Sequence, residues 1–205
     1  MKITFLGTAA AEGYPNPFCR CENCEGARKV GGRALRKRAS ALIDDQLLID
    51  FGPDLLPASQ MHDVPLADIR YAVQTHGHDD HLFPDNFMYR TDRCLAEGVH
   101  DIEYAVSPFV ARTIKNALVH QFRSGDDLGR NQFPSFRMEL VIHRQWETVE
   151  LGPYELLAIP AVHAPGTEAR ILGIRRKAGL LHRASPSLLY ATDTGVLPEA
   201  TVEAC

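Results

Sequence analysis

Short apolar runs separated by turn-forming residues characterise the first third of the chain. The runs Lys2–Leu6, Ser40–Ile43 and Leu47–Ile49 are too short for stable helices and are typical of buried strands. Asp44–Asp45 predicts the turn between the last two of these strands, because aspartate favours tight turns. A further predicted strand, Tyr71–Gln74, leads directly into a histidine-rich segment.

Two helices are predicted among these strands. Residues 8–20 are expected to form a loop because glycine and proline interrupt them, and Asp54–Met61 is expected to form a short helix. A longer helix is predicted at Ser107–Phe122, where Ser107 can cap the N-terminus and Pro108 suits the first helical position. Its apolar face consists of Val110, Ile114, Ala117 and Leu118.

The region after Ser135 is predicted to be rich in strands. The expected strands are Phe136–Ile142, Thr148–Leu151, Tyr154–Ile159, Ile171–Arg175 and Leu188–Ala191. The chain therefore runs from strands to helices and back to strands, which predicts mixed sheets with helices outside them. No linker or internal repeat divides residues 1–205, so we expect a single domain.

Composition and charge narrow the class of protein. Hydrophobic residues make up 45% of the chain and charged residues 23%, which predicts a packed core rather than disorder. The net charge of −4 argues against a surface that binds nucleic acid throughout. No apolar stretch reaches the roughly 18 residues of a membrane span, and the N-terminus is not typical of a signal peptide. We therefore expect a cytoplasmic protein without a membrane partner.

Positions 75–82 read Thr-His-Gly-His-Asp-Asp-His-Leu, which concentrates metal-type ligands in one short segment. His76 and His78 can point the same way from an extended chain and bind one cation, while Asp80 and His81 can reach a neighbouring cation. Histidine and carboxylate ligands suit Zn²⁺ best, with Mn²⁺ or Fe²⁺ as alternatives. Two cations about 3.5–4 Å apart form the arrangement that hydrolyses phosphoesters. The alternative is a polar surface loop that binds nothing.

This motif resembles the signature of the metallo-β-lactamase superfamily. Phe5–Thr8 resembles the first strand and turn of that superfamily, and Leu47–Gly52 resembles the turn after its third strand. Pro160–His163 resembles the loop that supplies a further histidine, and Leu189–Gly195 the strand end that supplies a bridging aspartate. The resemblance implies an α+β fold, the αββα four-layer sandwich, with two facing mixed sheets and the metal site at one sheet edge.

The resemblance also implies two sets of metal ligands that share one aspartate. The first set consists of His76, His78, His163 and Asp193. The second set consists of Asp80, His81 and the same Asp193. Asp80 would in addition act as a catalytic residue that orients the attacking water.

The chain departs from the superfamily pattern near its C-terminus. A full site has one more histidine on a loop after the bridging aspartate, whereas no histidine follows His182 before the chain ends at Cys205. We therefore expect the sandwich to lack its last strands and closing helix, the second cation to be bound weakly, and activity to be low or absent. The alternative is a naturally shortened member of the superfamily.

Three of the five cysteines, Cys19, Cys21 and Cys24, lie within six residues of one another. In a reducing compartment this spacing predicts a structural Zn²⁺ site, for which Cys94 or a histidine could supply the fourth ligand. The loop resembles that of the PhnP-like branch of the superfamily, the phosphoribosyl cyclic phosphodiesterases, where a C-terminal histidine is the fourth ligand. It also resembles the loop of the PqqB proteins of pyrroloquinoline-quinone biosynthesis.

A run of positive charge follows the cysteines. It consists of Arg28, Lys29, Arg33, Arg36, Lys37 and Arg38. Such a run is most often a solvated face; the alternative is recognition of phosphate oxygens by arginine side chains.

The resemblance implies a metal-dependent phosphodiesterase that cleaves a small cyclic or nucleotide-like phosphodiester with water activated by two cations. One alternative is a hydrolase of the same fold that acts on a thioester, a β-lactam or an RNA 3′ end, although the acidic chain disfavours nucleic acid. The other alternative is a PqqB-like protein that binds metal without catalysis. We further expect the protein to form a homodimer.

Overall fold

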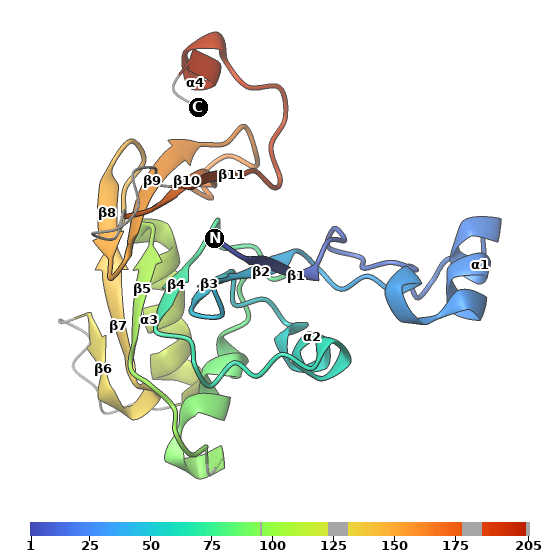
Figure 1. Ribbon diagram of the computed structural model, residues 1–205, viewed down its shortest axis with the longest axis horizontal. Helices are drawn as coiled ribbons and strands as arrows, with labels where there is room; N and C mark the ends of the chain where they lie inside the picture. The colour runs from blue at the N-terminus through green and yellow to red at the C-terminus, as the bar shows by residue number, and fades with distance from the viewer. Residues whose placement is uncertain (95, 123–130, 178–185, 204–205) are drawn as a thin grey trace.

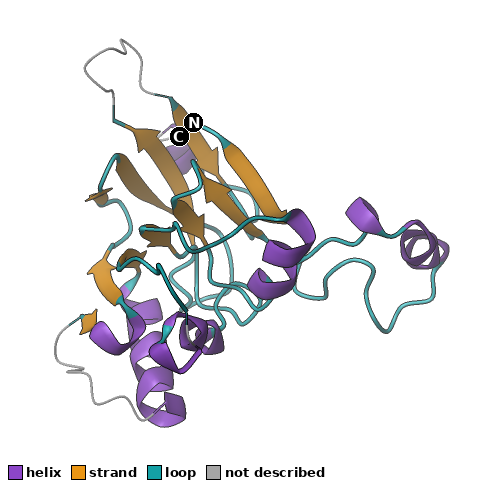
Figure 2. Ribbon diagram, turned by 60° about the horizontal axis from the view of Figure 1, so that its bottom comes forward, coloured by secondary structure: helices purple, strands orange, loops and turns teal. Residues whose placement is uncertain are grey.

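The computed structural model describes residues 1–94, 96–122, 131–177 and 186–203 (Figure 1). Two β-sheets face each other, and the helices Leu55–His62 and Pro108–Phe122 pack on the outer side of the larger sheet (Figures 1 and 2). The larger sheet has seven strands in the order β1-β2-β3-β4-β5-β7-β6, and the smaller sheet has four in the order β11-β10-β9-β8. This arrangement confirms the predicted fold class.

The larger sheet joins antiparallel and parallel pairings. Its strands are β1 (Ile3–Gly7), β2 (Ser40–Ile43), β3 (Leu47–Ile49), β4 (Tyr71–Val73), β5 (Ile102–Val106), β6 (Gln132–Phe133) and β7 (Met138–Ile142). The first three strands are antiparallel neighbours, whereas β3, β4, β5 and β7 run parallel. Parallel neighbours need crossover connections, and helices α2 (Leu55–His62) and α3 (Pro108–Phe122) lie within two of them.

The smaller sheet is antiparallel throughout. It contains β8 (Thr148–Leu151), β9 (Tyr154–Pro160), β10 (Arg170–Arg176) and β11 (Ser187–Tyr190), followed by the short helix α4 (Glu199–Glu203). Within the described ranges, α4 is the longest helix after β11. Those ranges therefore contain one helical layer and two sheets of the predicted four-layer sandwich. His182 and Cys205 lie outside the described residues.

Alternate residues of the central strands face different layers, which explains why these strands are apolar on both sides. In β2, Leu42 faces the helices, whereas Ala41 and Ile43 face the smaller sheet. The helix-side cluster includes Leu48, Ala72, Tyr104, Val110, Ile114 and Leu118. The cluster between the sheets includes Leu47, Ile49, Val73, Leu156, Leu172 and Ile174.

The predicted elements agree with the structure except at a few positions. The strands at Ser40–Ile43, Leu47–Ile49 and Thr148–Leu151 have the expected bounds. Ser107 caps α3, because its Oγ accepts the Val110 N–H at 3.2 Å. The strand predicted from Phe136 begins only at Met138, since Pro134–Phe136 forms a 3-10 helix. Strands β5 and β6, helix α1 (Glu22–Val30) and helix α4 were not predicted.

The segment between β1 and β2 leaves the body of the molecule as an arm that carries α1 (Figures 1 and 2). At the base of this arm, the N–H groups of Thr8 and Ala9 donate to the Lys37 carbonyl at 2.9 and 2.8 Å. Ala39 N–H returns a bond to the Ala9 carbonyl at 3.0 Å. No helix in the described part of the chain is long and apolar enough to cross a membrane.

Candidate metal centre

Three loops from two different sheets meet at one site. The first loop follows β4 of the larger sheet and carries His76–His81. The second follows β9 and carries His163, and the third follows β11 and carries Asp193, both in the smaller sheet. The site therefore forms only when the two sheets pack against each other.

Three imidazoles form the first group of potential ligands. The Nδ1 atom of His78 lies 3.1 Å from His76 Nε2 and 3.1 Å from His163 Nε2. These nitrogens all lie within 4.8 Å of one another. His76 is buried and His163 is exposed, so the group opens to solvent on the side of His163.

The second group consists of His76, His81 and Asp193. Asp193 Oδ2 lies 2.7 Å from His81 Nε2 and 3.5 Å from His76 Nε2. Asp80 Oδ2 lies 3.5 Å from the same His81 nitrogen but belongs to neither group. The predicted histidines and Asp193 thus come together, but in this geometry His76, and not the predicted Asp193, is shared between the two groups.

Asp50 orients His81 from behind. This buried carboxylate follows β3 and lies 2.7 Å from His81 Nδ1, which leaves Nε2 facing Asp193. It also accepts hydrogen bonds from the N–H and the hydroxyl of Thr75 at 2.7 and 2.8 Å. A carboxylate in this position fixes the tautomer and the orientation of a metal-binding histidine. Leu47–Gly52 resembled a superfamily turn, but sequence reasoning assigned Asp50 no role.

Gln74 cross-links the two ends of the loop His76–His81, called the ligand loop below. Its buried side-chain amide donates to the carbonyls of His76 and His81 at 2.8 and 2.9 Å. The amide oxygen accepts hydrogen bonds from Phe51 N–H and the Tyr104 hydroxyl. No sequence signal indicated this role, because a glutamine at a strand end is most often simply exposed.

Burial and crowding keep His76 neutral. Burial and, after it, the nearby imidazoles of His81, His78 and His163 lower the pKa of His76 to about 3. At His81 burial acts in the same direction, but the hydrogen bond to Asp50 and the carboxylates of Asp50, Asp80 and Asp193 raise its pKa to about 9. Converging imidazole nitrogens next to a carboxylate are the donor set of a borderline divalent cation such as Zn²⁺, so the residues fit such an ion.

A further group of potential ligands lies on the arm. The sulfur atoms of Cys19, Cys21 and Cys24 lie within 4.8 Å of one another, next to the start of α1. Cys94 lies far along the chain in the 3-10 helix Asp92–Cys94 and is not part of this group among the described residues. Hydrogen bonds from the Cys24 backbone and from the Cys19 and Cys24 side chains lower the pKa of the Cys21 thiol.

The basic run that follows the cysteines is partly used within the protein. Arg38 forms a bidentate pair with Asp54, with both bonds at 3.0 Å, and Arg28 pairs with Glu25 at 2.7 Å. The Arg36 guanidinium stacks 5.0 Å above the Tyr14 ring. Lys29, Arg33 and Lys37 form no salt bridge with the residues that the structure describes.

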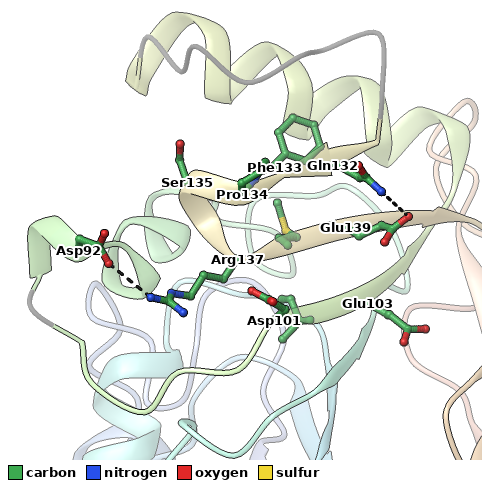
Figure 3. Close-up of a pocket in the computed structure, with 11 residues that line it drawn as sticks. Asp92, Asp101, Glu103, Gln132, Phe133, Pro134, Ser135, Arg137 and Glu139 are labelled. Atoms are coloured by element: carbon green, nitrogen blue, oxygen red, sulfur yellow. Dashed lines mark hydrogen bonds and ion pairs between the residues drawn. The ribbon is translucent and has the colours of Figure 1, made fainter.

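A separate hollow of about 490 Å³ lies where β5 and β7 begin (Figure 3). This is the amino end of the parallel strands, opposite to the end that carries the metal centre. Asp101, Glu103 and Glu139 line the hollow, and Arg137 at its rim pairs with Asp92 at 3.6 Å (Figure 3). The charged residues of its lining are mainly acidic, which does not suit an anionic ligand. The candidate metal centre is instead at the carboxyl end of β4.

Several known proteins resemble the chain. Coenzyme PQQ synthesis protein B from Azoarcus sp. (strain BH72) is 36% identical over 70 residues, which cover 32% of this chain and only 22% of that relative. The crystal structure of a diphosphatase from the PhnP family has a TM-score of 0.65 at 23% identity and covers 98% of this chain and 68% of its own. Zn²⁺-bound PqqB from Methylobacterium extorquens has a TM-score of 0.68 at 20% identity, with the same coverage.

The short form of human tRNase Z has a TM-score of 0.59 at 16% identity and covers 99% of this chain and 73% of its own. At these identities the structures share the fold. The family model described as the beta-lactamase superfamily domain matches residues 45–205, which contain all the histidines and aspartates of the metal centre. The chain therefore belongs to the metallo-β-lactamase superfamily and resembles its PhnP-like branch.

Proposed function

We propose that this protein is a metal-dependent hydrolase of a small phosphodiester, cyclic or nucleotide-like. The observation that carries the proposal is the convergence of two adjacent ligand groups that share His76. The similar structure from the PhnP family is that of a diphosphatase, which supports hydrolysis at phosphorus by a protein of the same fold.

Cations held by the two groups would polarise a phosphoryl oxygen and lower the pKa of water. The protein's own residues prepare this chemistry. His76, held neutral by its surroundings, offers a nitrogen lone pair, and Asp50 keeps the Nε2 atom of His81 turned towards the site. Asp80, beside His81, is proposed to accept a hydrogen bond from the attacking water and so to orient it.

The mouth of the site supports a small substrate that enters from solvent. His163 and Val162 are exposed there, and Asp193 is half-buried. Phosphate oxygens carry negative charge, which bound cations would stabilise in a protein whose own net charge is −4. We propose Zn²⁺ as the cation, with Mn²⁺ or Fe²⁺ as alternatives.

The test is turnover of bis-p-nitrophenyl phosphate by protein loaded with Zn²⁺. We expect slow release of nitrophenolate that stops when a chelator removes the metal. Asp193→Asn should bind one cation fewer per chain and lose at least about tenfold in rate, because the second group loses its carboxylate. Asp45→Asn, on the exposed turn after β2, is the matched control and should behave like the parent. Full metal content and an unchanged rate in Asp193→Asn would contradict the assignment.

A second candidate is a PqqB-like protein that binds metal without hydrolysing phosphodiesters. The 36% identity over 70 residues to a PQQ synthesis protein favours it. The same experiment separates the two, since this candidate predicts stable Zn²⁺ binding without nitrophenolate release.

A further inference from the structure

Arg170, the first residue of β10, is a buried cation that lies under the ligand loops. Its side chain is 1% exposed, and no described carboxylate forms an ion pair with it. Instead the guanidinium donates to the carbonyl oxygens of His143, at 2.7 Å, and of Gln74. A buried charge without a carboxylate partner is costly, so a specific role is expected to maintain it.

The bonded carbonyls lie at the carboxyl ends of neighbouring strands. Gln74 follows β4, His143 follows β7, and Ala105 of β5 accepts a longer bond from Arg170 at 3.5 Å. The backbone N–H of Arg170 also donates to the Thr75 carbonyl at 3.1 Å. Thr75 directly precedes His76, so Arg170 fixes the point at which the ligand loop leaves the larger sheet. The planar fork of arginine suits several carbonyls at once, which lysine cannot match.

Glu168 supports the ligand loop indirectly, through the first turn of α3. Its carboxylate accepts the N–H of Phe109 at the start of α3, at 2.8 Å. The Phe109 ring in turn packs against Gly77, where an added Cβ would lie only 2.9 Å from the ring. The N-terminal end of a helix attracts a carboxylate, because its N–H groups are unpaired and its dipole is positive.

Both anchors lie at the end of the loop that carries His163, Glu168 within the loop and Arg170 as the first residue of β10. This loop joins β9 to β10, and it is closed by a bond from Ala161 N–H to the Ala169 carbonyl at 3.0 Å. His163 itself is exposed, and within the described chain its side-chain hydrogen bond is to His78, another candidate ligand. Its position relative to the His76 loop is therefore set by the anchors at one end of its own loop.

We propose that Glu168 and Arg170 form a clamp that sets the distance between His163 and the pair His76 and His78. The clamp is a positioning device: neither residue lies in a ligand group. It rests on the proposed metal-dependent function, because its effect is on a cation held by these three imidazoles. The alternative is that Arg170 only stabilises the fold.

The experiment measures Zn²⁺ affinity by competition with a chromogenic chelator, the visible absorption of the Co²⁺-loaded protein, and the melting temperature of the metal-free protein. Cys19 is replaced by serine throughout to weaken competing binding at the cysteines. Arg170→Lys keeps the charge and loses the fork. Ile174→Val, at a buried position of the same strand, is the control that affects stability alone.

We expect Arg170→Lys to bind Zn²⁺ at least about tenfold more weakly than the parent and to change the Co²⁺ spectrum, as expected when a ligand's support is removed. Ile174→Val should lower the melting temperature without either effect. Equal Zn²⁺ affinity in the parent and both variants overturns the clamp.

If Arg170→Lys does not fold, the Zn²⁺ affinity of Glu168→Asn tests the clamp instead. Asparagine accepts the left-handed backbone of Glu168, with its φ of 49°, but is too short to reach Phe109. A severalfold loss of Zn²⁺ affinity supports the clamp, and an unchanged affinity overturns it. Failure of the hydrolase proposal is distinct: the parent would bind Zn²⁺ without cleaving the diester. A parent without Zn²⁺ at these histidines refutes the metal centre and the clamp together.

Discussion

At the scale of single residues, chemical identity revealed the candidate ligands but not their supports. Histidine and aspartate at His76–His81 stand out in a sequence because few other roles need them so close together. Asp50 and Gln74 do not stand out, since their partners are distant in sequence and are set by the pairing of strands. The ligands could therefore be proposed from sequence, whereas the hydrogen bonds that orient them required the three-dimensional structure.

Asp50→Asn should weaken metal binding more than it weakens the fold. Asparagine suits the left-handed backbone at this position, where φ is 67°, and it can still accept the Thr75 N–H. It loses the charge that holds the His81 Nδ1 proton, so we expect Zn²⁺ affinity to fall about 10- to 100-fold. Competition with a chromogenic chelator measures this, and Asp45→Asn serves as the exposed control. Equal affinities in the two variants would show that Asp50 does not support the site.

At the scale of elements, local patterns were sufficient to predict a helix or strand where its apolar residues form one clear run or face. The strands β2 and β3 and the helix α3 have strong patterns, and their predicted bounds are close to the observed ones. Helix α1 was missed because Gly26 and Gly31 interrupt a polar segment in which only Cys24 and Ala27 are buried. Its apolar face is too small for periodicity to reveal.

Two glycine substitutions should have opposite effects on stability. Gly7 ends β1, and a Cβ there would overlap the Arg38 carbonyl oxygen and lie 2.6 Å from that of Lys37. Both are backbone atoms at the base of the arm, so Gly7→Ala should destabilise the protein by about 3 kcal/mol or more. Gly26→Ala, inside α1 with no atom within 4 Å of the added Cβ, should stabilise its helix by up to about 1 kcal/mol.

Urea denaturation of the metal-free variants measures both changes in the free energy of unfolding. If Gly7→Ala and Gly26→Ala gave the same midpoint, the close approach of β1 to the arm would not constrain the fold.

At the scale of the whole molecule, the packing of two sheets creates the site. Neither the order β1-β2-β3-β4-β5-β7-β6 nor the antiparallel second sheet follows from hydrophobic patterns, because pairing between distant strands leaves no local signal. Resemblance to a known superfamily implied the layered arrangement of two facing sheets with helices outside, and the family match supports that fold class, but the strand order itself was not predicted. The buried Arg170 and its carbonyl partners remained unpredicted for the same reason.

A cation bound at this centre should stabilise the entire fold. His76 belongs to one sheet, whereas His163 and Asp193 follow strands of the other, so the bound ion links the sheets. Binding to the folded state alone contributes about 2.7 kcal/mol when free Zn²⁺ is about 100 times its dissociation constant. We expect the melting temperature to rise with Zn²⁺ and fall with a chelator, and Asp193→Asn to reduce the difference.

Mg²⁺ at the same concentration is the control, because it prefers oxygen ligands and should have little effect. A melting temperature that Zn²⁺ leaves unchanged would mean that the histidines do not bind it.

The spread of these ligands along the chain also affects biosynthesis. A polypeptide leaves the ribosome from its N-terminus, so His76–His81 is synthesised well before Asp193. A nascent chain that has exposed only the first histidines can hold a metal ion loosely, by two or three imidazoles, and can lose it again. At the proposed metal centre we expect tight retention only after β11 has been added, so that metal uptake would be a late, chemically detectable marker that synthesis and folding have passed that strand.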